Sequence, residues 1–253
     1  MKISAVIIAF NEEAKIADAI SSVGWADEVL VVDSESTDRT REIAEQLGAR
    51  VLVEKWRGFP GQKQFAADNA KYDMILSLDA DERIAPELRD DILGIDERSS
   101  AAAYDMPRLS IYMGRSIRHG GWYPDRQLRL FDRRRGRWKD VVVHESFKMD
   151  EGAIIGSLNG DILHYSVDGP AEHGRIILER YAPLSAKQMF NTGQTTSLLK
   201  IAFTPILAFV STYVFKAGFL DGVAGLCISY FGAYNVFLKH VLLWELQHKT
   251  EDP

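Results

Sequence analysis

The sequence predicts an α/β protein with a mainly parallel sheet, flanked by helices and followed by an apolar helical segment. Short apolar runs alternate with helical patterns up to residue 80, which is typical of strands joined by crossover helices. Polar residues follow several of these apolar runs, and two long, nearly uncharged stretches lie after residue 196. With 253 residues, the chain is long enough to bury a sizeable core.

The first part of the chain predicts a β-α-β-α-β-α-β series. Apolar runs indicate strands, and apolar residues at helical spacing indicate helices between them. Gly48 suits the end of the second helix. Such alternation favours parallel strands joined by right-handed crossovers. The strands are expected at 3–10, 28–32, 50–54 and 74–78, and the helices at 13–23, 38–47 and 61–70.

Three of these strands end in polar residues. The first ends at Phe10 and is followed by Asn11 and Glu12, the second is followed by Asp33, and the fourth is followed by Asp79-Ala80-Asp81. The carboxyl ends of parallel strands meet at one edge of a sheet, where open α/β sheets bind ligands. Two carboxylates there suit a hard divalent cation, although capping of the next element is an alternative. Neither a Gly-x-Gly-x-x-Gly nor a P-loop pattern occurs. The kind of nucleotide binding that remains is one in which carboxylates and a metal hold the nucleotide.

Composition narrows the classes of function. The formal net charge of −6 argues against a general nucleic-acid binder. The one cysteine, Cys227, can form no disulfide within the chain, which fits a reducing compartment. The apolar run near the N-terminus lacks a cleavable-signal pattern and is too short to span a bilayer.

The segments Val6–Glu13, Val31–Asp38 and Leu78–Glu82, in this order and spacing, resemble the family 2 glycosyltransferases, which have the GT-A fold. Trp25–Glu28, Trp56–Phe59 and Val143-His144-Glu145 are similar to small lipopolysaccharide-core β-glycosyltransferases. The resemblance covers most of the chain. It implies inverting transfer of a hexose, expected to be glucose, from a UDP-sugar to a lipid-linked acceptor, an inner-core heptose of lipopolysaccharide. A transferase acting on polyprenyl phosphate or another envelope glycan is the alternative.

The resemblance also assigns donor and metal residues. Asp81 would be the main ligand of Mg²⁺ or Mn²⁺, with Asp79 and a late histidine, His164 or alternatively His173, completing the site. A carboxylate can accept the uracil N3–H or ribose hydroxyls, and a metal can neutralise the diphosphate leaving group. Lys63, a lone helical lysine, is expected on a solvated face. The residues expected around the nucleotide are Phe10, Asn11, Glu12, Asp33 and Asp79.

The segment 108–139 is strongly basic, with ten Lys or Arg and two Asp, so its formal charge is 10 − 2 = +8. Aromatic residues are interleaved with the basic ones. Arginine beside aromatic rings suits an acceptor that carries sugars and phosphates, so we expect Trp122, Arg126 and Arg129 to bind the acceptor. Contact with anionic lipid headgroups and a simply solvated charge run are the alternatives.

The catalytic base is expected just after this segment. An inverting transfer needs a base to take the proton of the acceptor hydroxyl, and a carboxylate can do this. Glu145 follows the apolar run 141–143 at the position that matches the family's base. His144 would orient it or bind acceptor, and Asp140 and Asp150 are alternatives.

Two apolar stretches, 201–215 and 217–238, define the C-terminal region. We expect helices that lie in the membrane interface or enter one leaflet at the cytoplasmic face of the bacterial inner membrane. A buried helical hairpin or an oligomer interface is the alternative, and the sequence leaves the oligomeric state open. The expected organisation is a catalytic domain, 1–195, with a nucleotide-sugar half (1–100) and an acceptor half (101–195), then a membrane-associating region, 196–253.

Two other classes compete with this interpretation. Phosphatases of the haloacid-dehalogenase type also end a strand in Asp-x-Asp, but there the motif lies near the first strand and a Thr or Val follows. Glu82 and the mid-chain position count against that class. A sugar-nucleotide sensor or scaffold without catalysis has the same motifs, and an acceptor-dependent product would separate the two.

Overall fold

The computed structural model describes residues 1–96, 98–139 and 146–248, and it divides into two compact units. The first unit comprises residues 1–108 and 125–164, and the second comprises residues 109–124 and the chain from residue 165 onward. The predicted boundary at residue 195 differs from this division. The helices that follow residue 165 pack along the long C-terminal helix of the second unit, so the division falls before them.

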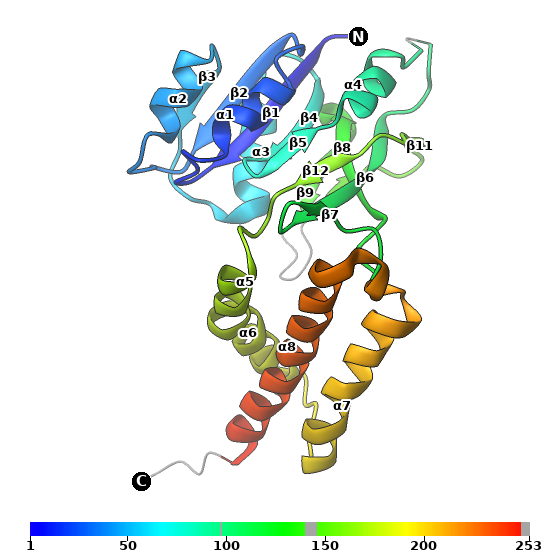
Figure 1. Ribbon diagram of the computed structural model, residues 1–253. Coiled ribbons are helices and arrows are strands. Elements are labelled where there is room, and N and C mark those ends of the chain that lie inside the picture. Colours follow the sequence, from blue (N-terminus) through cyan, green and yellow to red (C-terminus); the bar gives the residue numbers. More distant parts are fainter. Residues whose placement is uncertain (97, 140–145, 249–253) are drawn as a thin grey trace. The chain divides into compact units, whose positions relative to one another are not determined.

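The first unit contains a mixed sheet flanked by helices (Figure 1). Its helices are α1 (Ile16–Ser22), α2 (Thr40–Gln46), α3 (Gly58–Asn69) and α4 (Pro86–Leu93). Its strands are β1 (Ile3–Ala9), β2 (Glu28–Asp33), β3 (Arg50–Val53), β4 (Met74–Asp79), β5 (Glu82–Ile84), β6 (Ala103–Tyr112), which continues into the second unit, β8 (Asp125–Asp132), β9 (Gly136–Lys139), β10 (Ser146–Met149), β11 (Ile155–Ser157) and β12 (Ile162–His164).

The sheet order is β3-β2-β1-β4-β8-β6-β12-β5. The first four of these strands run parallel, which confirms the predicted alternation, and β8 pairs antiparallel with both β4 and β6. The predicted strands and helices of this region lie within a few residues of their observed bounds. Gly48 ends α2 with φ of +82°, and its N–H donates to the carbonyl of Glu45.

Two hydrophobic clusters cover the two faces of this sheet. Alternate residues of β1 point to opposite faces, as the two-residue period of a strand requires. Helices α1, α2 and α4 pack on one face, where Ile7 is fully buried. On the other face, α3 packs beside the antiparallel hairpin of β9 and β10, whose Trp138 and Phe147 are buried.

The second unit is mostly helical. Its strand β7 (Arg115–Ser116) pairs with the end of β6, and the long helices α7 and α8 lie side by side (Figure 1). Tyr112 and Ile117 form a small buried cluster with Ala224 and Ile228 of α8. The helices are α5 (Pro170–Ile176), α6 (Ala182–Asn191), α7 (Leu198–Val210) and α8 (Gly222–His248).

Proline shapes two of these helices. Residues 170–191 form one helical stretch, with a π-helical turn at Ile177–Tyr181 before Pro183. A proline cannot donate to the carbonyl four residues earlier, and a wider turn accommodates that missing bond. Helix α7 contains Pro205 and also ends in a π-helical turn, Ser211–Phe215.

The two C-terminal helices are long and apolar enough to cross a membrane. None of the 18 residues 198–215 is buried, and residues 218–248 contain an apolar stretch of 18 residues that is 22% buried. Exposed apolar side chains such as Leu199, Phe203 and Phe215 cover α7 and the turn that follows it. Length and composition carry this finding, which agrees with the predicted apolar helical region.

Candidate active site

The polar ends of three parallel strands meet at one edge of the sheet, as the sequence predicts. The register pairs Ala9 of β1 with Asp33 of β2, and Ile8 with Asp79 of β4. The residues after β1 therefore lie between those that follow β2 and β4. This edge is the candidate active site.

Asn11 and the residues after β2 hold each other in place. Asn11 has φ of 53°, its backbone N–H donates to Ser36 Oγ at 2.8 Å, and its Oδ1 accepts the backbone N–H of Thr37 at 2.8 Å. The N–H of Glu12 donates to Thr40 Oγ1 at 2.8 Å. The predicted donor role of Asn11 stays a prediction, and the structure adds a local one: its side chain joins the two loops.

Asp33 is fully buried at the end of β2. Its Oδ2 accepts the backbone N–H of Ser36 at 2.9 Å. Its Oδ1 is buried without a hydrogen-bond partner among the described residues. Such an oxygen retains the desolvation cost of an unmade bond, so a ligand N–H or hydroxyl that reaches it gains that energy. Phe10, by contrast, is 56% exposed.

Asp79 lies between two cations. Lys63 Nζ is 2.9 Å from Asp79 Oδ1, and Arg129 Nη2 donates to Asp79 Oδ2 at 3.0 Å. Burial by itself raises the pKa of Asp79, but the charges of Lys63 and Arg129 outweigh it and hold the pKa well below its ordinary value. Asp79 is therefore a carboxylate at neutral pH. Both of its oxygens face a cation, and the predicted role of Asp79 as a metal ligand stays a prediction.

Lys63 corrects an expectation. The sequence analysis expects this lysine on a solvated face of its helix, but only 1% of Lys63 is exposed. Its ammonium also lies 5.1 Å from the centre of the Trp138 ring, a cation–π contact. The burial of a lysine is stable only with such compensation, and Asp79 and Trp138 provide it.

Glu82 extends this charged group beneath the surface. The side chain is fully buried, and its Oε1 accepts from Arg129 Nη2 at 2.7 Å and from Arg108 Nη1 at 3.1 Å. Its Oε2 accepts the backbone N–H of Asp79 at 3.1 Å. Arg108 also binds Asp125 at 2.7 Å. Glu82 therefore fixes the backbone at the end of β4 and neutralises the arginines.

Asp81 and His164 approach each other across neighbouring strands. Strand β12 pairs antiparallel with β5, with His164 opposite Glu82. This register brings His164 Nε2 within 3.4 Å of Asp81 Oδ2, and both side chains are partly exposed. A carboxylate oxygen and an imidazole nitrogen form a donor pair that suits Mn²⁺ or Mg²⁺. Within the part of the chain that the structure describes, no group of three His, Cys, Asp or Glu side chains is positioned to hold a metal.

The predicted acceptor residues lie in three different settings. Arg129 is 4% exposed and bonds the donor-side carboxylates, whereas Arg126 binds Asp105 and the carbonyl of Leu158 at 2.9 Å. Trp122 belongs to the second unit, where its ring packs edge-on against His173 at 6.3 Å. The predicted base Glu145 and its neighbour His144 lie outside the described residues. Their roles, like those of Trp122, Arg126 and Arg129, stay predictions.

Lys63, Glu82 and Arg108 are the site residues that the sequence analysis did not assign. A buried lysine in a weakly amphipathic helix gives no periodic signal, because the helical pattern alone does not show which polar side chain faces inward. Glu82 follows Asp81 directly, and its place in the Leu78–Glu82 motif is the one signal that marks it.

Comparison with known proteins identifies the family. Residues 4–149, more than half of the chain, match the sequence model of glycosyl transferase family 2. The chain therefore belongs to this family and is a glycosyltransferase, and its mostly parallel sheet flanked by helices is the GT-A arrangement that the resemblance implies.

Relatives extend the similarity over nearly the whole chain. An uncharacterised glycosyltransferase of Rickettsia typhi is 34% identical over 263 residues, covering 99% of this chain and 89% of that protein. The lipopolysaccharide core biosynthesis glycosyltransferase LpsC of Rhizobium meliloti is 28% identical over 260 residues, covering 96% and 94% of the two chains. The solved structure of S. aureus TarS, residues 1–349, aligns over 100% of this chain and 93% of that one, with 14% identity and a TM-score of 0.49.

Proposed function

We propose that this glycosyltransferase moves a hexose, glucose in view of the resemblance, from a UDP-sugar to a lipid-linked acceptor with inversion at the anomeric carbon. The observation that carries the donor half is the Asp81–His164 pair beside the polar strand ends of Asp33 and Asp79. A lipopolysaccharide inner-core heptose is the proposed acceptor, supported by the name of the Rhizobium relative. Transfer to polyprenyl phosphate or another envelope glycan is the alternative.

The protein's own residues have separate parts in this proposal. Asp33 Oδ1 accepts from the nucleotide, and Lys63 with Arg129 keeps Asp79 ionised beside it. A divalent cation held by Asp81 and His164 would neutralise the diphosphate of the leaving UDP. Glu145 takes the proton from the acceptor hydroxyl.

The donor half is tested by titrating a panel of nucleotide sugars against the protein, with and without Mn²⁺. We expect tight, metal-dependent binding of one UDP-hexose and its loss in Asp81→Ala. Asp68→Ala, which removes an exposed carboxylate of α3, is the matched control and should bind as the wild type does. Unchanged donor affinity in Asp81→Ala would refute the metal role.

The base is tested by turnover of the Glu145→Gln variant. Because general-base catalysis contributes about 10²- to 10⁴-fold, we expect a loss of that size in turnover with donor affinity preserved. Near-normal turnover would remove Glu145 from this role. An acceptor panel of core oligosaccharide and polyprenyl phosphate separates the proposed acceptor from its alternative.

Membrane association at the cytoplasmic face of the inner membrane is the last part of the proposal. It is supported by the exposed apolar side chains of α7, among them Leu199, Phe203 and Ile206 on neighbouring turns. Replacing Leu199 and Phe203 by Asn should weaken sedimentation with vesicles, because it places amides where the acyl chains would lie. Full sedimentation of the double variant would count against this anchor.

A further inference from the structure

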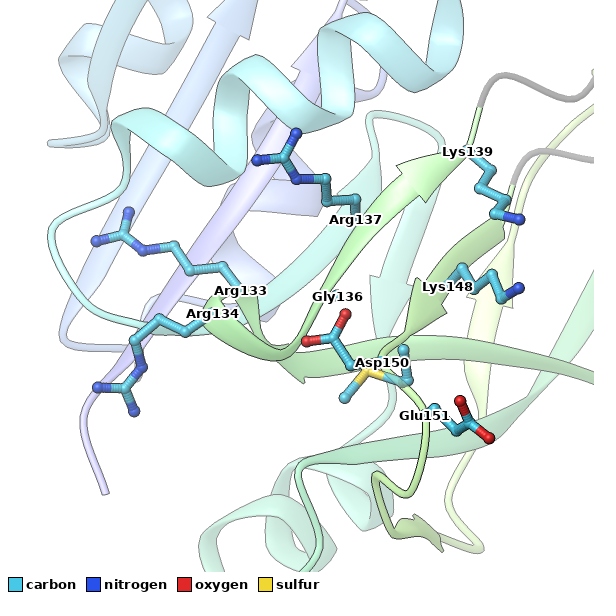
Figure 2. Close-up of a pocket in the computed structure, with 9 residues that line it drawn as sticks. Arg133, Arg134, Gly136, Arg137, Lys139, Lys148, Asp150 and Glu151 are labelled. Carbon is cyan, nitrogen blue, oxygen red and sulfur yellow. The ribbon is translucent and has the colours of Figure 1, made fainter.

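The hairpin of β9 and β10 presents three basic side chains on its outer face. Arg137 of β9 stands directly opposite Lys148 of β10, and Lys139 is two residues further along β9. Residues at this spacing point to the same side of a two-stranded sheet. All three side chains are exposed and line an open hollow of about 520 Å³. Figure 2 shows Lys139 and Lys148 projecting side by side from the two strands, while the side chain of Arg137 extends away from them.

Among the described residues, no carboxylate pairs with these three cations. Arg133 and Arg134 line the same hollow, but they are paired with Asp73 and Asp132. Within residues 1–96, 98–139 and 146–248, Arg137, Lys139 and Lys148 form no ion pair with a carboxylate, and this includes Asp150 and Glu151 at the rim of the hollow. The outer face is thus a concentration of positive charge in an acidic protein.

Like charges face each other across the two strands. Directly opposed like charges destabilise an antiparallel pair, and here Arg137 opposes Lys148. The neighbouring Lys148 lowers the pKa of the Lys139 ammonium. An anion placed between these groups removes the repulsion, so the protein without a ligand carries a cost that an anion relieves.

The inner face of the hairpin holds this arrangement rigid. Phe147 stacks on Phe131 with the ring centres 3.6 Å apart, and Trp138 packs edge-on against both rings. The N–H of Trp138 also donates to Gln64 Oε1 at 3.0 Å. Because the inner side chains are anchored in the core, the strands that carry the outer ones need little reorganisation to meet a ligand.

We propose that the outer face of the β9–β10 hairpin, formed by Arg137, Lys139 and Lys148, binds a phosphate group. A guanidinium can bind two phosphate oxygens at once, and two ammonium groups supply further charge-assisted hydrogen bonds. A phosphorylated saccharide and an anionic phospholipid headgroup share this chemistry. The proposal does not depend on which sugar the enzyme transfers.

The first test measures thermal unfolding of the full chain in rising inorganic phosphate, against sodium chloride of equal ionic strength. The variant Lys139→Gln/Lys148→Gln should need about tenfold more phosphate for the same rise in Tm, because it loses two charge-assisted contacts. The matched control is Lys2→Gln/Lys71→Gln, which removes two exposed lysines that lie beside Tyr72, just before the first residues of β1 and β4. An equal response of the Lys139/Lys148 variant and the wild type would overturn the proposal.

The second test identifies the source of the phosphate. Glucose 6-phosphate is compared with glucose, and vesicles of phosphatidylglycerol with vesicles of phosphatidylcholine. If the Lys139/Lys148 variant loses affinity for the sugar phosphate alone, the ligand is a phosphorylated saccharide, and selective loss on phosphatidylglycerol assigns a headgroup. Unchanged binding of both probes overturns the site. UDP-sugar binding, measured on the same variant, should remain at the wild-type value, so failure of the donor proposal is seen separately.

Discussion

Two groups of three basic residues in the first unit differ in burial and in partners. The paired cations, Lys63, Arg108 and Arg129, lie at the end of β4 and bond the carboxylates Asp79, Glu82 and Asp125. The outer-face cations, Arg137, Lys139 and Lys148, stand exposed and form no such pairs within the described part of the chain. The charges are the same in number and sign, but only the first group is neutralised from within.

This difference indicates two uses of positive charge. A buried cation must be compensated by the protein itself, so the paired cations can only orient and ionise neighbouring carboxylates. An exposed cation costs little without a partner and remains available to a ligand. Substitutions of the paired cations and of the outer-face cations test this distinction. The largest effect is expected at Arg129.

Arg129→Met should lower the free energy of unfolding by about 3 kcal/mol, because Asp79 and Glu82 then share fewer buried counter-charges. Urea unfolding measures this change. Arg134→Met is the matched control, since Arg134 is mostly exposed and pairs with surface acids, and its effect should stay within about 0.5 kcal/mol. Equal effects of the two substitutions would remove the distinction.

Lys63→Met should lower the free energy of unfolding by about 2 kcal/mol, the range of a charge-assisted hydrogen bond, since Arg129 still compensates Asp79. The same variant should bind the UDP-sugar more weakly, because Asp79 loses one of the two cations that fix its orientation. A variant as stable as the wild type would show that the Lys63–Asp79 pair contributes nothing net.

The pH dependence of this difference follows from the lowered pKa of Asp79. A carboxyl whose pKa falls below its ordinary value of 3.8 on folding stabilises the protein fully above that value, and this contribution is lost as the pH falls through the folded pKa. The wild type and Lys63→Met should therefore differ equally at pH 7 and pH 5, and less below about pH 4. A difference that narrows between pH 7 and pH 5 would contradict this assignment.

The smallest effect is expected at the outer face. Lys148→Gln should leave the free energy of unfolding unchanged or raise it by about 0.5 kcal/mol, because it removes a like-charge pair with Arg137. Lys148→Glu should raise it slightly further by forming an attractive pair. A loss of stability in Lys148→Gln would show that this lysine has an internal partner. The distinction between the paired cations and the outer-face cations would then fail.

The parallel sheet and the edge that carries the site were predictable from the sequence. Buried strands read as continuous apolar runs, and the residues that end them fall at one edge whatever the later topology. His164 was expected near Asp81 because the family resemblance implies a late histidine at the metal site, and the pairing of β12 with β5 brings the two side chains together. The predictions of the strands and of the edge rest on local patterns that tertiary packing does not reverse.

The charge network was not predictable in the same way. Arg129 follows Asp79 by 50 residues and shares no local pattern with it, and the antiparallel pairing of β8 with β4 brings the two together. The direction in which Lys63 points depends on Trp138, a residue of the distant β9 strand. Long-range register decides such contacts, and a single sequence carries no signal for that register.

The chain visits the helical unit twice, first with residues 109–124 and again after residue 165. During synthesis, residues 109–124 leave the ribosome well before α8. Tyr112 and Ile117 can therefore be buried against Ala224 and Ile228 only after α8 has been synthesised. For the same reason, no single cut separates the two units. A catalytic fragment that ends after His164 retains the 109–124 excursion with its apolar side chains uncovered, and replacing that excursion by a short turn is the way to make such a fragment soluble.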